Sequence, residues 1–206
     1  MEEKSYSSVD HKGIPFDLKL NELFNNKKDG VFVEVGAFNG IDYSNTAFFE
    51  FYKNWTGILI EPSFKCYENC IQHRPKSICV NAACVSNDYN SDTVIGDFNN
   101  ITMASVNGAR LGATSSELVS VPAKTLESIF DSYNVTSIDF LSLDTEGYEL
   151  NVLKGNNFSK YRPKYMLIEV YLNDVDNIIN FLKENQYEMV SNFSRFNLND
   201  NPGWDG

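Results

Sequence analysis

The amino-acid sequence predicts an α/β fold in which a mostly parallel central sheet is covered by helices on both faces. Short apolar runs alternate with segments of helical periodicity along the chain, which is typical of this class. A glycine-containing turn, residues 36–40, follows the first apolar run. Three acidic residues crowd together directly after a later apolar run, within residues 144–149. The 206 residues fit a single domain.

The first half of the chain is expected to supply three core strands. A helix over residues 14–24 precedes the first strand, residues 31–35, and a helix around residues 45–52 follows it. The second strand, residues 57–60, leads to a helix that Ser63 can cap and that ends near residue 72. Residues 78–85 are expected to form the third strand, whereas residues 1–12 are polar and expected to be flexible.

The second half of the chain begins with a polar, glycine-containing stretch, residues 86–117, which we expect to form a hairpin and a mobile loop inserted in the domain. A short strand at 118–121 and a helix at 126–133 precede core strands at 138–143 and 165–170. Val175, Ile178, Ile179 and Leu182 then form the stripe of an amphipathic helix. Residues 188–193 are expected to form a sixth strand, and the tail from 197 to 206 is too polar for a core strand.

Charge and composition exclude several classes of partner. The net charge of −11 argues against binding to nucleic acids or to anionic membranes, which requires a basic surface. No apolar run has the length of a membrane span, and the N-terminus lacks the pattern of a secretory signal. We therefore expect a soluble, cytoplasmic protein whose four cysteines are reduced.

The turn after the first strand suits a nucleoside that carries an amino acid. Gly36 lets the backbone turn sharply, and Gly40 permits close packing or a positive φ. Phe38 stands where a dinucleotide-binding turn has its middle glycine, which argues against a pyrophosphate. Glu34 suits a cationic amino group, and Glu61, at the end of the second strand, can accept hydrogen bonds from both hydroxyls of a ribose.

On these residues the chain resembles the S-adenosylmethionine-dependent methyltransferases of the FkbM family. The resemblance runs from about residue 29 to residue 170, and the segment around the three acids is its most specific part. The matching segments are residues 33–37 with Gly40, 44–46, 55–57, 60–62, 81–83, 125–126, 144–149, 152–155 and 168–169.

The resemblance implies a three-layer Rossmann-like methyltransferase fold and methylation of an oxygen, often on sugars or glycosylated metabolites. It implies that S-adenosylmethionine is held by Glu34, Gly36, Ala37, Gly40, Asn45, Glu61, Asn81, Ala82 and Asp144. Within this set, Glu34 and the two glycines line the methionine part, Glu61 holds the ribose, and residues 81–82 approach the adenine. Family sheets finish with a C-terminal hairpin, whereas this chain stops at Gly206, so the last strand is expected to be missing or supplied by a partner.

The acids after the fourth core strand are the candidates for catalysis. A hydroxyl is a poor nucleophile until its proton starts to leave, so a nearby base is needed. Asp144 is the first candidate and Glu146 the second, whereas Glu149 is as well explained as an acid at a helix N-terminus. A divalent cation held by Asp144 and Glu169, with Asn173 or Asp174 as a third ligand, is an alternative that we do not favour.

Acceptor recognition is expected in the 86–117 loop, which includes Arg110. Aromatic faces for a sugar ring are available from Tyr43, Tyr148 and Tyr171, and His11 is a further candidate base if the N-terminal segment reaches the site. Two other functions stay open: a nicotinamide-dependent oxidoreductase on a similar fold, and a cofactor-binding interaction module without turnover. The expected partner is a small-molecule or glycan acceptor, and a homo-oligomer stays open.

Overall fold

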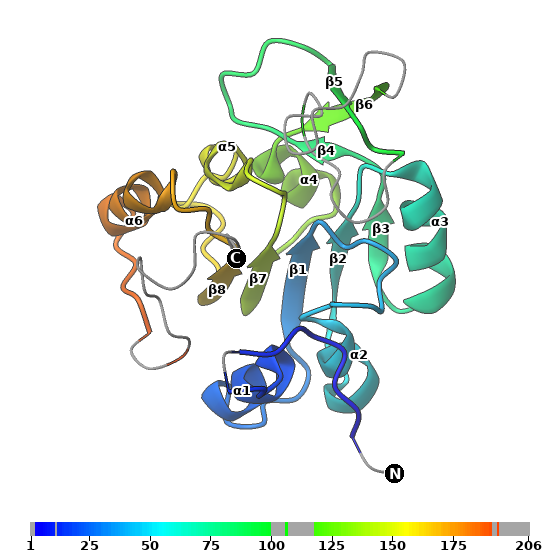
Figure 1. The fold of residues 1–206 in the computed structure, drawn as a ribbon, viewed down its shortest axis with the longest axis vertical. Helices are drawn as coiled ribbons and strands as arrows, with labels where there is room; N and C mark the ends of the chain where they lie inside the picture. Colours follow the sequence, from blue (N-terminus) through cyan, green and yellow to red (C-terminus); the bar gives the residue numbers. More distant parts are fainter. Residues whose placement is uncertain (1–2, 11, 100–105, 107–117, 191–192, 194–206) are drawn as a thin grey trace.

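The computed structural model describes residues 3–10, 12–99, 106, 118–190 and 193. Five parallel strands form the central sheet in the order β3-β2-β1-β7-β8 (Figure 1). These strands are β1 (Val31–Val35), β2 (Thr56–Ile60), β3 (Ile78–Val80), β7 (Phe140–Leu143) and β8 (Tyr165–Ile168). The described helices are α1 (Phe16–Leu23), α2 (Ala47–Lys53), α3 (Phe64–His73), α4 (Leu126–Ser132), α5 (Glu149–Lys154) and α6 (Val175–Glu184). This is the expected Rossmann-like arrangement.

The chain reverses its direction of travel across the sheet between β1 and β7. It first runs outward from β1 through β2 to β3, and it returns to β7 on the other side of β1. Ligands of open α/β sheets bind at such a switch point, beyond the carboxyl ends of the strands. The strand order therefore places the end of β1 and the end of β7 at the binding position.

Helices cover both faces of the sheet, so the domain has three layers. Successive side chains of a strand point to opposite faces. On one face, Phe32 and Phe140 pack against α1, α2 and α3. On the other face, Val33 and Leu141 pack against α4, α5 and α6. The apolar runs seen in the sequence are thus strands buried on both sides.

A second, three-stranded sheet lies beyond the carboxyl ends of the central strands (Figure 1). It consists of β4 (Ala83–Cys84), β6 (Val119–Lys124) and β5 (Thr93–Gly96), with β5 antiparallel to β6. The single strand expected over residues 78–85 was wrong: β3 and β4 belong to different sheets. Asn81 lies at the break, where its Nδ2 donates to the carbonyl oxygens of Glu61 and Pro62, 2.9 Å away in each case.

The two ends of the chain differ from expectation. Residues 188–190 are not in a strand, so β8 is an edge strand within the described sheet. Residues 3–10, expected to be flexible, are tied to α1 and α2 by side-chain and backbone contacts. The tail, residues 197–206, lies outside the described residues. None of the described helices combines the length and the apolar character needed to cross a membrane.

Candidate active site

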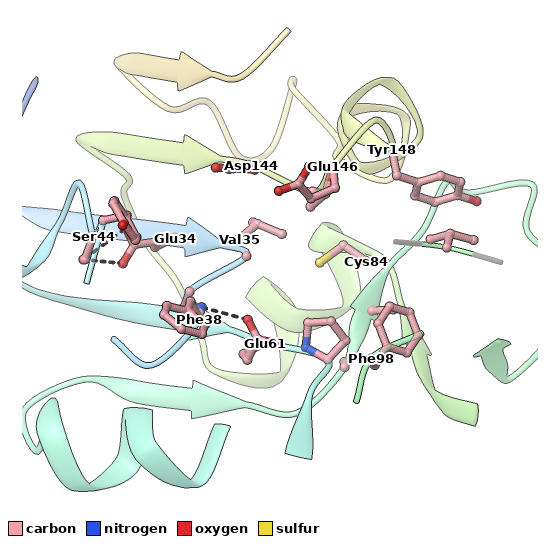
Figure 2. Close-up of a pocket in the computed structure, with 18 of the residues that line it drawn as sticks. Glu34, Val35, Phe38, Ser44, Glu61, Cys84, Phe98, Asp144, Glu146 and Tyr148 are labelled. Carbon is pink, nitrogen blue, oxygen red and sulfur yellow. Dashed lines mark hydrogen bonds between the residues drawn. The ribbon is translucent and has the colours of Figure 1, made fainter. Parts of the chain in front are cut away.

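A cavity of about 370 Å³ lies at the switch point between β1 and β7 (Figure 2). Glu34 and Ser44 lie toward one end and Tyr148 and Phe98 toward the other, with Asp144 and Glu61 between them. The described lining residues are Ser8, Glu34, Val35, Gly36, Ala37, Phe38, Asp42, Tyr43, Ser44, Glu61, Pro62, Ala82, Ala83, Cys84, Phe98, Val106, Asp144, Thr145, Glu146 and Tyr148. One end is thus mainly polar and the other mainly apolar.

Gly36 brings the ends of β1 and β7 into direct contact. Its φ of +81° is in the left-handed region, and a Cβ there would lie 1.8 Å from the carbonyl oxygen of Asp144. Its amide donates to the Ile60 carbonyl at 3.0 Å, while the Asp144 amide donates to the Val35 carbonyl at 3.1 Å. Glycine is therefore required for the backbone approach that sets Asp144 beside the cavity.

Glu34 is buried, and its carboxylate accepts hydrogen bonds from the loop that precedes α2. Its oxygens accept from the hydroxyls of Ser44 and Thr46, both at 2.8 Å, and from the amide of Asn45 at 2.9 Å. Burial raises the pKa of Glu34, and Arg74 opposes that shift. The expected contact with a cationic amino group stays a prediction, because Glu34 reaches the cavity but is already hydrogen-bonded.

Arg74 stabilises this loop through hydrogen bonds. The sequence analysis did not identify this role. The side chain is fully buried. It donates to Glu50 Oε2 at 2.8 Å, to the Gly40 carbonyl at 2.9 Å, and to the hydroxyl of Thr46 at 3.0 Å. Its Nη1 also lies 3.8 Å from Glu34. No sequence signal marked this contact, because Arg74 and Glu50 meet only through the packing of α2 against the end of α3.

Glu61 lies at the end of β2 and is also buried. Its two oxygens accept from the amides of Phe38 and Ser63, at 2.8 Å each. Burial raises the pKa of Glu61 to about 7, and repulsion from Asp144 adds to the shift. Each carboxylate oxygen retains a further lone pair for a ligand hydroxyl. Ser63 occupies the N-cap position of α3, although its side chain makes no capping hydrogen bond.

Asp144 directly follows β7 and faces the cavity. It converges with Glu149 and Glu169, and one oxygen from each lies within 4.8 Å of the others. The Oε2 atom of Glu169 is buried and has no hydrogen-bond partner among the described residues. Two carboxylates this close need a proton, a donor or a cation between them.

The pKa values of Asp144 and Glu169 diverge as a proton-sharing pair requires. Restricted hydration inside the cavity raises the pKa of Asp144 to about 6, although the side chain is accessible to a ligand. Burial first, and the nearby Asp144 second, raise the pKa of Glu169 to about 9. Because the pKa of Glu169 is raised further than that of Asp144, Asp144 loses its proton first as the pH rises, and a protonated Glu169 beside it offers an O–H donor.

Glu149 has the structural role that the sequence left open. It is buried at the start of α5, where its Oε1 accepts from the amide of Thr145 at 2.8 Å and from the amide of Gly147 at 3.2 Å. Glu146 lines the cavity with a φ of 56° and accepts from the Tyr171 hydroxyl at 2.6 Å. The turn thus holds two of its three acids through hydrogen bonds with its own backbone and with Tyr171.

The remaining predicted residues divide into two groups. Ala37, Ala82, Tyr43 and Tyr148 line the cavity. Gly40, Asn45 and Asn81 are not among the described lining residues. Gly40, with a φ of +78°, packs against Arg74 and Cys70, and Asn45 donates to the hydroxyl of Ser142 at 3.0 Å. His11 and Arg110 lie outside the described residues, Asp174 is not in the cluster formed by Asp144, Glu149 and Glu169, and a role for Asn173 stays a prediction.

Sequence reasoning also missed Ser8 and Phe98, which both line the cavity. Neither stands in a motif. Phe98 reaches the cavity from the end of β5, and Ser8 reaches it from the N-terminal segment. Only the tertiary structure brings these segments to the switch point.

The model of the methyltransferase FkbM domain family matches residues 34–189, more than half of the chain. The chain therefore belongs to the FkbM methyltransferase family. No curated protein matches the chain, and no solved structure matches it. The family assignment therefore rests on the domain itself, and it agrees with the position of the cavity at the switch point.

Proposed function

We propose that the protein transfers a methyl group from S-adenosylmethionine to a hydroxyl of a carbohydrate or a glycosylated small molecule, with Asp144 as the general base. One observation carries the proposal. Asp144 presents a carboxylate of raised pKa to the cavity, where the glycine turn of β1 touches the end of β7. Family membership supports methyl transfer as the reaction.

We assign each part of the cofactor to a different part of the cavity wall. We assign the ribose to Glu61, whose raised pKa falls when its oxygens accept hydrogen bonds from ribose hydroxyls. We assign the adenine to the apolar end, between Pro62, Ala82 and Phe98. The methionine part then lies along the glycine turn toward Ser44. This order leaves Asp144 beside the sulfonium.

S-adenosylmethionine supplies an activated methyl group when it is bound. The protein aligns the acceptor oxygen with that methyl group, which is chiefly an effect of position. Asp144 takes the proton of the acceptor hydroxyl as the new bond forms. Glu169 positions Asp144 by donating a hydrogen bond to it, and Glu146 assists from the same turn.

A divalent cation at Asp144 and Glu169 is the alternative way to relieve their repulsion. Three carboxylates suit a hard cation. However, Glu149 Oε1 already accepts hydrogen bonds from the turn, and a proton shared between Asp144 and Glu169 relieves the repulsion without a cation. A loss of activity on chelation that Mg²⁺ restores would establish the cation and displace the shared proton.

The proposal is tested by incubating the protein with S-adenosylmethionine and a panel of free sugars, glycosides and non-sugar alcohols. We expect one or more glycosidic acceptors to gain the mass of one methyl group, with S-adenosylhomocysteine formed in equal amount. Binding of S-adenosylhomocysteine without product across the panel would favour the non-catalytic module. Methylation confined to nitrogen or carbon atoms would contradict the assignment of the acceptor.

A further inference from the structure

The N-terminal segment, residues 3–10, crosses from α2 to α1 and forms what we call the strap (dark blue in Figure 1). Glu3 pairs with Lys53 at the end of α2, with 2.9 Å between carboxylate and amine. The ring of Tyr6 lies 5.3 Å from the ring of Phe51. These contacts fix the start of the strap against α2.

Asp17, in the first turn of α1, holds the middle of the strap. Asp17 is fully buried, and its carboxylate accepts hydrogen bonds from the Ser5 hydroxyl at 2.8 Å and from the Tyr6 amide at 2.7 Å. A third donor is the Ser7 amide at 3.3 Å, while the Asp17 amide donates to the Ser7 hydroxyl at 2.9 Å. A buried carboxylate is costly without such donors, so strap and carboxylate hold each other in place.

The strap reaches the cavity at Ser8. Ser7 forms a parallel bridge with Tyr43, and the Ser8 carbonyl accepts from the Phe16 amide at 3.0 Å. Ser8 lines the cavity, as do Tyr43, the bridge partner of Ser7, and Ser44. Val9, the next residue, bridges to Pro15 and is 55% exposed. Among the described strap residues, Ser8 alone lines the cavity.

We infer that the strap is the wall of the cofactor cavity at its amino-acid end, with Ser8 as a ligand-contacting residue and Asp17 as a positioning residue. The inference rests on the proposed function, which places the methionine part at this end. A serine hydroxyl can donate a hydrogen bond to a ligand carboxylate and can accept one from a ligand ammonium group. Because Glu34 is already hydrogen-bonded by its own loop, the other polar groups at this end of the cavity, including the Ser8 hydroxyl, become more important for the ligand.

A matched pair of strap variants tests the contact. Ser8→Trp puts a large side chain at the cavity wall, whereas Val9→Trp puts the same side chain on the exposed position next to it. In calorimetric titrations with S-adenosylhomocysteine, we expect Ser8→Trp to weaken binding by about tenfold or more, which corresponds to about 1.4 kcal/mol. Val9→Trp is expected to bind like the wild type.

The outcomes separate this inference from the proposed function. Equal affinities of the two tryptophan variants and the wild type would overturn the strap as a wall of the site and leave the proposed function standing. A wild-type protein that does not bind S-adenosylhomocysteine would overturn both. Tighter binding by Ser8→Trp than by Val9→Trp would also contradict the inference, because it would show that the position tolerates the added bulk.

A second pair tests the positioning role. Asp17→Ala removes the buried acceptor, and Glu22→Gln removes an exposed charge from the same helix, α1. We expect Asp17→Ala to speed amide hydrogen exchange at Tyr6 and Ser7 and to weaken S-adenosylhomocysteine binding, while Glu22→Gln does neither. Faster exchange with unchanged affinity in Asp17→Ala would show that the carboxylate has a structural role alone.

Discussion

Asp144 is the residue on which the proposed chemistry depends most directly. Its side chain reaches the cavity, while its backbone is clamped to β1 through the Val35 carbonyl and the turn at Gly36. We expect Asp144→Asn to lower kcat by about 10²–10⁴-fold, since the amide cannot take the proton. Asp176→Asn removes a comparable charge from the exposed face of α6 and is expected to leave kcat unchanged. A rate near that of the wild type for Asp144→Asn would remove it as the base.

The pH dependence of the rate follows from the same group. A general base is active when it is ionised, and the pKa of Asp144 is raised to about 6. The value of kcat/KM is therefore expected to rise with pH through about 6 and then to level off. The measurement is a profile of initial rates from pH 4.5 to pH 9 in buffers of constant ionic strength. A rate that falls as pH rises through 6 would mean that Asp144 acts in its protonated form.

At the residue level, sequence patterns predicted the positions of the acidic residues better than the role of each one. The position of Asp144 after an apolar run predicted a carboxylate at the end of a core strand, and in the structure Asp144 follows β7 and lines the cavity. The pattern ranked Asp144 first, but it left Glu149 open between catalysis and a role at a helix N-terminus. Their difference comes from hydrogen bonds: Glu149 turns inward to the backbone of its own turn.

The glycine turn between β1 and α2 is the element that shapes the cavity. Gly36→Ala would place a methyl group 1.8 Å from the Asp144 carbonyl oxygen at a φ of +81°. Gly13→Ala is a matched control, because Gly13 has a φ of +76° with nothing within 4 Å of its Cβ position. The control is expected to lose about 1–2 kcal/mol of stability from backbone strain alone.

We expect Gly36→Ala to lose more stability than this control and to lose cofactor binding as well, because β1 and β7 must separate. Urea unfolding and calorimetric titration with S-adenosylhomocysteine measure the two effects. Equal stability of the two alanine variants would show that the contact at Gly36 is not a constraint.

The loop that follows this turn depends on Arg74, which joins α3 to α2. Arg74→Met would leave the buried carboxylates of Glu34 and Glu50 without their cation. Removing one partner of a buried ion pair costs about 3–5 kcal/mol. We expect a loss of that size in urea unfolding, whereas Arg162→Met, which removes an exposed side chain bonded to two carbonyl groups, is expected to cost less. An equal loss in the two variants would contradict the special role of Arg74.

Among the elements, helical and strand periodicity predicted the central sheet and failed where strands are short. Residues 78–85 look like one apolar strand, but the chain bends at Asn81 and passes from one sheet to the other. The bend depends on hydrogen bonds to the end of β2, which no local pattern encodes. The N-terminal strap was missed for a similar reason, since its order comes from the buried carboxylate of Asp17.

At the scale of the molecule, the fold brings together residues from five separate parts of the chain. The strap, the ends of β1, β2 and β7, and the second sheet each supply part of the cavity wall. The alternation of strands and helices was enough to predict the three layers. The shape of the cavity was not predictable, because Ser8 and Phe98 reach it only through long-range packing.

The central claim is that this cavity binds S-adenosylmethionine and places it beside Asp144. Paired calorimetric titrations with S-adenosylhomocysteine and with NAD test it most directly, in the wild type and in Asp144→Asn. We expect saturable one-to-one binding of S-adenosylhomocysteine to both proteins and no heat of binding with NAD. Saturable binding of NAD, with none of S-adenosylhomocysteine, would contradict it.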